Sequence, residues 1–174
     1  MKLKCVLILL IFIVFGCDDK ESPEPENFIS ITTEDRSYLF TQDIGVFNVY
    51  IIGSNQDQLS MVLKSENNFL CEIHIQQSNL LQRDFPFSLP SAGDYAYGEI
   101  QIINLNIDVD STFGADDDVN FVGISFEDLE ITILSFDDGL LRGRVNGPVT
   151  TKTGREMSIE NGEFKVHIEI EEGA

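Results

Sequence analysis

The chain has 174 residues with 30 acidic and 11 basic side chains, which give a formal net charge of −19. Because an acidic chain repels phosphate, this charge argues against nucleic-acid binding and against attachment to an anionic bilayer by charge alone. Hydrophobic residues make up 43% of the sequence, which is enough for one domain with a hydrophobic core and argues against a disordered acidic polymer.

Residues 1–16 have the pattern of a secretory signal peptide. Lys2 and Lys4 form a short positive region, and residues 6–15 are an unbroken apolar run. This run is too short to cross the hydrocarbon core of a bilayer, which takes about 20 helical residues. Gly16 and Cys17 follow the run directly.

A small residue directly before a cysteine, at the end of such a run, resembles the lipobox of bacterial lipoproteins. In that family a diacylglycerol is joined to the cysteine thiol, the chain is cut before the cysteine, and the new amino group is usually acylated, with palmitate as one such acyl group. The resemblance therefore implies a lipid anchor at Cys17, and several acyl chains hold a protein stably to a membrane. An ordinary cleaved signal with a chance cysteine is the alternative.

Residues 17–27 are expected to form an acidic tether after the lipidated cysteine. Residues 18–27 read DDKESPEPEN and have too little apolar surface to fold. An acidic tract with a lysine at this place resembles the surface-export signal of Bacteroidota-type lipoproteins. That resemblance implies a domain that faces outward from the cell outer membrane, with a periplasm-facing domain as the alternative. Cleavage before Cys17 leaves 9 basic and 30 acidic side chains, a net charge of about −21.

Residues 28–174 are expected to form a single all-β domain, because apolar and polar residues alternate between turn residues. Short strands at this spacing favour an antiparallel β-sandwich or a partly closed barrel with a C-terminal meander over residues 128–170. The expected strands are 28–32, 36–41, 45–53, 58–64, 69–76, 98–107, 119–126, 128–136, 141–148, 154–160 and 163–170.

Asn161-Gly162 is the strongest two-residue hairpin signal in the chain, because both positions of a type I′ turn need positive φ. A turn centred there pairs Ile159 with Phe164, so apolar side chains meet across the ladder. The residues around this turn, within residues 129–169, resemble the C-terminal part of small Bacteroidota-type lipoproteins of uncharacterised function. These turn motifs imply a fold and no chemistry.

A second hairpin is predicted at Asp138-Gly139, followed by a turn at Thr153-Gly154. The Asp138-Gly139 register pairs Ile133 with Arg144, which sets an apolar side chain beside a charged one. Either both faces of this hairpin are partly covered, or its loop is longer than two residues.

Catalytic signals are absent from the sequence. It contains no nucleophile elbow, Walker loop, dinucleotide fingerprint, Cys-x-x-Cys or His-Glu-x-x-His. Cys71 alternates with apolar residues and is expected to be a buried hydrophobe. His74 lies an odd number of residues away on the same strand, so it points to the opposite face and would not lower the pKa of the thiol. We therefore expect no enzyme and no cofactor.

Metal binding has two candidate locations. A zinc site at His74 and His167 would need adjacent strands and a third ligand, and both residues are expected on solvated faces. Residues 106–120 are a weak calcium candidate, because calcium takes six to eight oxygen ligands. The spacing does not fit an EF-hand, so a solvated acidic loop is the simpler interpretation. The carboxylates concerned are Asp108, Asp110, Asp116 and Asp118.

Together these features indicate a membrane-anchored cell-envelope lipoprotein with a non-enzymatic binding or structural role. Its partners would be the membrane, through the lipid anchor, and a protein or glycan that the sequence leaves open. One alternative is a lipocalin-like barrel with an enclosed apolar cavity. A second is a surface glycan hydrolase with two carboxylates in a cleft. A third is an acidic protein that its charge steers to basic partners.

Overall fold

The structure is a computed structural model that describes residues 25–44, 48–52, 56–89, 97–105, 121–124, 129–151 and 154–172. These segments are almost entirely β-structure, which confirms the predicted all-β class. Their helical structure is one 3₁₀ turn, η1 (Leu80–Gln82), so they contain no helix that could cross a membrane.

The strands follow one another at short intervals along the chain. They are β1 (Phe28–Thr33), β2 (Ser37–Phe40), β3 (Gln42–Asp43), β4 (Val49–Ile52), β5 (Asp57–Lys64), β6 (Phe69–Gln77), β7 (Phe87–Leu89), β8 (Tyr97–Asn104), β9 (Phe121–Ile124), β10 (Glu130–Asp137), β11 (Leu140–Thr151), β12 (Glu156–His167) and β13 (Glu169–Glu172).

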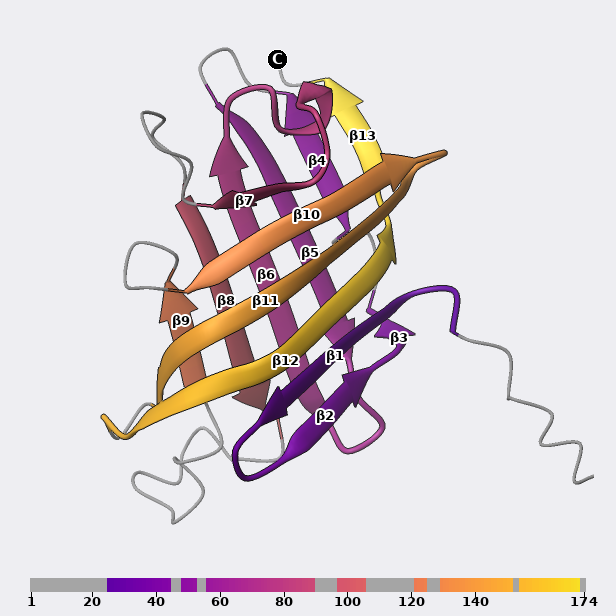
Figure 1. Cartoon of the computed structure of the whole chain (residues 1–174). Coiled ribbons are helices and arrows are strands. Elements are labelled where there is room, and N and C mark those ends of the chain that lie inside the picture. The colour runs from indigo at the N-terminus through magenta and orange to yellow at the C-terminus, as the bar shows by residue number, and fades with distance from the viewer. Residues whose placement is uncertain are drawn as a thin grey trace, which may run out of the picture.

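The strands form two layers, and the strands of the front layer run diagonally over those of the back layer (Figure 1). The back layer has the order β13-β4-β5-β6-β8-β9, and the front layer has the order β7-β10-β11-β12-β1-β2. β9 joins the layers on one side, because it pairs with both β8 and the end of β11. Within the described segments β13 and β2 end the path without pairing to each other, so the layers form a sandwich and not a closed barrel.

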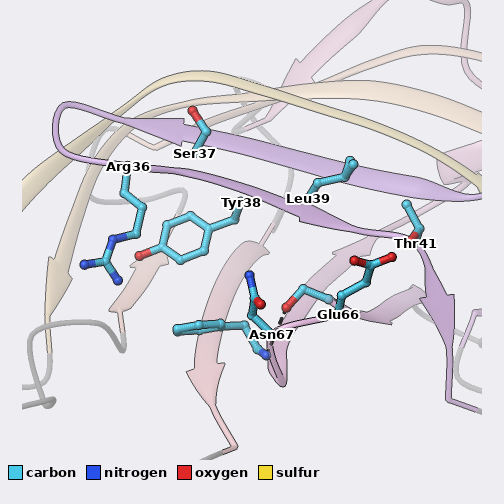
Figure 2. A pocket seen from close by; sticks show the side chains of 9 residues that line it. Arg36, Ser37, Tyr38, Leu39, Thr41, Glu66 and Asn67 are labelled. Carbon is cyan, nitrogen blue, oxygen red and sulfur yellow. Dashed lines mark hydrogen bonds between the residues drawn. The ribbon is translucent and has the colours of Figure 1, made fainter. Parts of the chain in front are cut away.

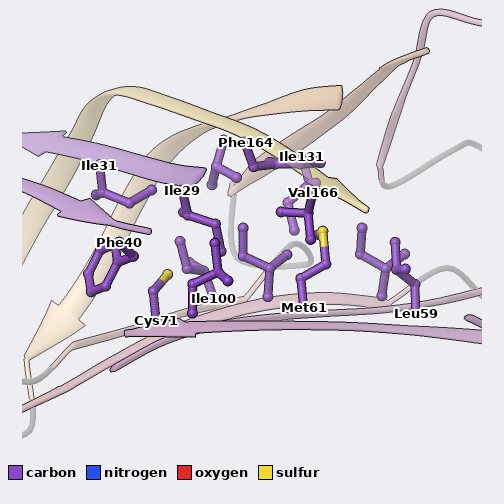
Figure 3. Close-up of a cluster of buried hydrophobic side chains, with 14 of the residues drawn as sticks. Ile29, Ile31, Phe40, Leu59, Met61, Cys71, Ile100, Ile131, Phe164 and Val166 are labelled. Carbon is purple, nitrogen blue, oxygen red and sulfur yellow. The ribbon is translucent and has the colours of Figure 1, made fainter. Parts of the chain in front are cut away.

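The core lies between the two layers, and both contribute to it (Figure 3). Ile29 and Phe164 come from the front layer, whereas Met61, Cys71 and Ile100 come from the back layer, and all are nearly inaccessible to solvent. Burial of each isoleucine, phenylalanine or methionine side chain among them contributes about 1.5–3 kcal/mol to the free energy of unfolding. These side chains occupy the interior that a lipocalin-like protein would use for its ligand.

The Asp138-Gly139 hairpin is confirmed. Asp138 has φ +48° and Gly139 has φ +77°, and the strands that they join pair directly on either side of them. The ladder contains a feature that the sequence did not predict, a β-bulge between Ile133 and Ser135. Because of this bulge Ile133 pairs with Gly143 instead of Arg144, and its side chain enters the core. The bulge therefore removes the conflict in the predicted register, which had set the apolar Ile133 beside the charged Arg144.

The prediction of a hairpin at Asn161-Gly162 is wrong. β12 runs without interruption from Glu156 to His167, and Gly162 pairs with Ile31 of β1 on one side and with Val145 of β11 on the other. The register of β12 shifts by one residue next to Asn161, which marks a β-bulge. A bulge shifts the alternation of apolar and polar residues by one position, and so does a two-residue turn. The sequence pattern therefore does not distinguish the two, and a turn was predicted where the structure has a bulge.

The predicted C-terminal meander is therefore shorter than expected. It contains three antiparallel strands, β10 to β12, instead of four. The turn between β11 and β12 contains Gly154, which has φ +87° and donates its N–H to the carbonyl of Thr151. The chain then changes layer after His167, and β13 pairs parallel to β4. The back layer is therefore mixed and not purely antiparallel.

Candidate functional site

Five of the residues singled out in the sequence lie outside the described segments. They are the lipid-anchor candidate Cys17 and the calcium candidates Asp108, Asp110, Asp116 and Asp118. The lipid anchor and the calcium site both remain predictions.

Cys71 and His74 lie on opposite faces of β6, as predicted. Cys71 is fully buried in the core, and this burial raises the pKa of its thiol well above the usual range. His74 lies on the outer face of the back layer, where its ring is within 3.1 Å of the Gln76 side chain. A thiol with a raised pKa and no imidazole on its face is a poor nucleophile, so Cys71 serves packing.

His167 is remote from His74. It ends β12 in the front layer, whereas His74 belongs to β6 in the back layer. The adjacent strands that a shared zinc site requires are therefore not formed. In the segments that the structure describes, no three His, Cys, Asp or Glu side chains are arranged to hold a metal ion.

A shallow pocket of about 230 Å³ lies on the outer face of β6 and β8. Glu72, His74, Glu99 and Gln101 line it, and Glu72 pairs with Gln101 while His74 pairs with Glu99. The two carboxylates are therefore diagonal neighbours on one sheet face. Glycoside hydrolysis needs two carboxylates on opposite sides of the scissile bond, so this arrangement does not favour a glycan hydrolase.

The Glu99 carboxylate accepts hydrogen bonds from the Tyr97 hydroxyl and from the Gln101 amide. Partial burial and this hydrogen bond raise the pKa of Tyr97 to about 12. Glu99 therefore acts as an acceptor that orders its neighbours on the sheet face.

A larger pocket of about 520 Å³ lies at one end of the sandwich, between β2 and the turn that joins β5 to β6 (Figure 2). We call it the β2 groove. One wall consists of β2 and the residues directly before and after it, and the other wall is the β5–β6 turn. The residues that line it are Arg36, Ser37, Tyr38, Leu39, Thr41, Ser65, Glu66, Asn67 and Phe69.

The β5–β6 turn is held rigidly by local hydrogen bonds. The Phe69 N–H donates to the Ser65 hydroxyl at 3.0 Å, and the Ser65 N–H donates to the Phe69 carbonyl at 2.8 Å. Asn68 takes φ +63°, a conformation that asparagine tolerates better than most residues. These contacts fix Glu66 and Asn67 at the rim of the β2 groove.

Two aromatic rings form the floor of the β2 groove. Tyr38 points inward from β2, and its ring meets the edge of Phe69 at a centroid distance of 5.4 Å. Burial raises the pKa of Tyr38, although the Arg36 guanidinium beside its hydroxyl acts in the opposite direction. The phenol therefore stays neutral at physiological pH and gives the groove a polar but uncharged floor.

The two charges of the β2 groove lie at opposite ends of β2. Arg36 precedes the strand, and Glu66 lies close to Thr41, which follows it (Figure 2). Both charged side chains are exposed. Among the described residues Arg36 forms no ion pair with an acidic side chain, although the chain has 30 acids for 11 bases. Within the part of the chain that the structure describes, the groove therefore offers a cation that no acidic side chain neutralises.

The segment before β1 is fastened to both layers. The Asn27 side chain accepts a hydrogen bond from the His167 N–H at 2.8 Å and donates one to Asp43 at 3.0 Å. Asp43 accepts a second hydrogen bond from the Asn48 side chain at 2.9 Å, and the side-chain amide oxygen of Asn48 accepts one from the Val62 N–H. The chain thus enters the sandwich through a fixed polar cluster.

The sequence did not reveal the β2 groove. Its two walls are 24 or more residues apart in the chain, and only the packing of the layers brings them together. The available signal was a predicted strand at 36–41 with an apolar side chain, Leu39, on its polar face. Comparison of the chain with protein-family models, curated proteins and solved structures found no match.

Proposed function

We propose that this chain is a lipoprotein of the cell outer membrane, held by a lipid on Cys17, whose β-sandwich faces outward as a non-enzymatic binding or structural module. The observation that carries the proposal is Gly16-Cys17 directly after a charged start and an apolar run. Its acyl chains would hold the protein to the membrane without a spanning helix.

The start of the sandwich supports this arrangement. Asn27 is hydrogen-bonded to the sandwich and β1 begins at Phe28, so residues 17–26 remain between the proposed lipid and the sandwich. Ten extended residues span at most about 35 Å. That reach is enough to set the sandwich clear of the lipid headgroups, so the exposed faces can meet a partner.

The chemistry of the two pockets supports a non-enzymatic role. The described residues that line the β2 groove include no histidine and no cysteine, so they supply no cysteine nucleophile and no imidazole base. The pocket at His74 holds its two carboxylates on one open face. Both pockets suit recognition better than covalent chemistry.

The test is expression of the full chain in a Gram-negative host that is fed radiolabelled palmitate. We expect label on the protein and recovery in the outer-membrane fraction. Cys17→Ser should abolish both, whereas Cys5→Ser and Cys71→Ala serve as matched controls and should keep both. Labelling that survives in Cys17→Ser would refute the anchor.

The outward orientation has a separate test. Protease added to intact cells should degrade the wild-type sandwich and spare a periplasmic marker. Replacing Asp18, Asp19 and Glu21 with serine should retain the lipid and remove this protease sensitivity. Unchanged sensitivity would show that the acidic tract is a spacer and not an export signal.

A further inference from the structure

We propose that the β2 groove binds the carboxyl-terminal segment of a partner protein, which adds to the free edge of β2 as an antiparallel strand and places its terminal carboxylate at Arg36. The inference goes beyond membrane anchoring. It rests on the groove alone and holds whether or not Cys17 carries a lipid.

The hydrogen bonds around β2 show which backbone groups face the groove. The Thr33 N–H donates to the Arg36 carbonyl at 2.9 Å, so residues 33 and 36 are a bonded pair. Bonded pairs alternate along an antiparallel ladder, so the backbone groups of Ser37 and Leu39 point away from β1. The Thr41 N–H follows the same alternation: it points away from β1 and donates a hydrogen bond to the Lys64 carbonyl.

Among the described residues no strand or charged side chain protects the outer edge of β2, whereas acidic side chains protect β13 at the opposite edge of the fold. Exposed edge strands usually carry charged residues or proline, which prevent pairing with other chains. β13, at the other end of the strand path, reads EIEE, whereas β2 reads SYLF. Leu39 is 55% exposed, the largest value among the big hydrophobic side chains of the described residues. An uncharged edge with an exposed leucine is suited to strand addition.

The charges of the groove set the direction of the peptide. An antiparallel strand ends beside the start of β2, where the Arg36 guanidinium can bind a carboxylate through two parallel hydrogen bonds. Its earlier residues lie beside Thr41 and Glu66, where a lysine or arginine is favoured. β2 has four residues, about 13 Å at 3.3 Å per residue, so the peptide contributes about four residues.

The net charge of −19 favours this partner over a second copy of the chain. Two strongly acidic chains repel each other, whereas a basic segment is attracted to the surface from a distance. The occupant is therefore an extended carboxyl-terminal segment with a basic residue about three positions before its end.

The experiment uses the full chain in mild detergent and two fluorescent peptides with free carboxylates, Lys-Val-Thr-Val and Lys-Thr-Val-Thr. They present apolar side chains on opposite faces of the added strand. We expect one of them to bind with 1:1 stoichiometry. Amidation of its carboxyl group should weaken binding about tenfold. Methylation of the backbone nitrogens that face β2 should abolish binding, because the side chains remain and the ladder is lost.

Variants of the protein locate the site. Arg36→Gln should weaken binding of the carboxylate peptide about tenfold and leave the amidated peptide unaffected. Leu39→Pro removes one outward N–H and none of the hydrogen bonds to β1, so the protein should stay folded and lose the peptide. Leu39→Thr keeps the edge and should retain binding within about threefold.

Three results would overturn the proposal. One is equal affinity for the amidated and the carboxylate peptide, and another is failure of both peptides to bind. The third is a concentration-dependent dimer in sedimentation that Leu39→Pro dissolves, because this would assign the edge to a second copy of the chain.

Discussion

Asp138-Gly139 and Asn161-Gly162 have almost the same chemistry and opposite places in the sandwich. Asp138-Gly139 is a turn in which both residues have positive φ and β10 returns at once as β11. Asn161-Gly162 lies inside β12, where neither residue has positive φ and each pairs with a neighbouring strand. A turn sequence therefore bends the chain only where no flanking strands occupy its backbone groups.

Glycine is required at the two places for different reasons. A Cβ added to Gly139 would have room, since its nearest neighbour is the Ile168 carbonyl oxygen at 3.8 Å. A Cβ on Gly162 would lie 2.5 Å from the Val145 carbonyl oxygen and 3.1 Å from the Ile31 side chain. Gly139 is thus needed for its conformation, whereas Gly162 is needed for the close approach of β1 and β11 to β12.

Insertion should distinguish the two dipeptides most strongly. A Gly-Ser-Gly insert between Asn161 and Gly162 interrupts a strand that is paired on both sides, so we expect a loss of about 4 kcal/mol or more in the free energy of unfolding. The same insert between Asp138 and Gly139 lengthens an exposed turn and should cost about 1–2 kcal/mol. Urea denaturation followed by circular dichroism measures both. Similar losses for the two inserts would contradict the continuous β12.

Alanine substitution should separate packing from conformation. Gly162→Ala forces a backbone shift against Val145, and we expect it to cost about 3 kcal/mol. Gly139→Ala should cost only the left-handed strain of about 1 kcal/mol. Gly154→Ala is the matched control, because Gly154 has φ +87° and no atom within 4 Å of the added Cβ. The same denaturation experiment applies, and a cost at Gly162 no larger than that at Gly154 would be inconsistent with close packing.

Valine at the first position of the turn should have an intermediate effect. Asp138 has φ +48°, which aspartate tolerates and a β-branched residue does not. We therefore expect Asp138→Val to lower the free energy of unfolding by about 1–2 kcal/mol. Thermal and urea melts provide the measurement, with Asp138→Asn as a control that should be nearly neutral. A stabilising valine would refute the type I′ turn.

The smallest effect is expected for the same substitution in the other dipeptide. Asn161 is exposed and extended in β12, where valine has a favourable strand propensity. Asn161→Val should therefore change the free energy of unfolding by no more than about 0.5 kcal/mol in either direction. A loss as large as that of Asp138→Val would indicate that Asn161 occupies a turn after all.

These two dipeptides also show where sequence analysis succeeds and where it fails. Alternation and turn residues depend on near neighbours, so they predict the all-β class and bounds such as 69–76 for β6 (Phe69–Gln77) within a residue or two. Residues 154–170 could form a hairpin, or one long strand followed by a change of layer. Which of the two forms depends on pairing with β1 and β11. Those strands lie far away in the sequence, and a bulge imitates the local signal of a turn.

The candidate sites differ in the same way. The motif at Gly16-Cys17, on which the proposed lipid anchor rests, consists of adjacent residues, so the sequence displays it directly. The β2 groove exists only after residues 36–41 and 65–69 meet at one end of the sandwich. Among the described strands β2 lies at the end of the strand order, and this place, which leaves its outer edge free of a paired strand, depends on every other pairing in the layer.

The central claim, that a lipid on Cys17 ties this sandwich to the membrane, is tested most directly by top-down mass spectrometry of the protein isolated from a Gram-negative host. We predict a single mature species whose first residue is Cys17 and whose mass includes a diacylglycerol and an additional acyl chain, with fragment ions that place all of this mass on that residue. A species that starts at Met1, or one that starts at Cys17 without lipid, would contradict the account.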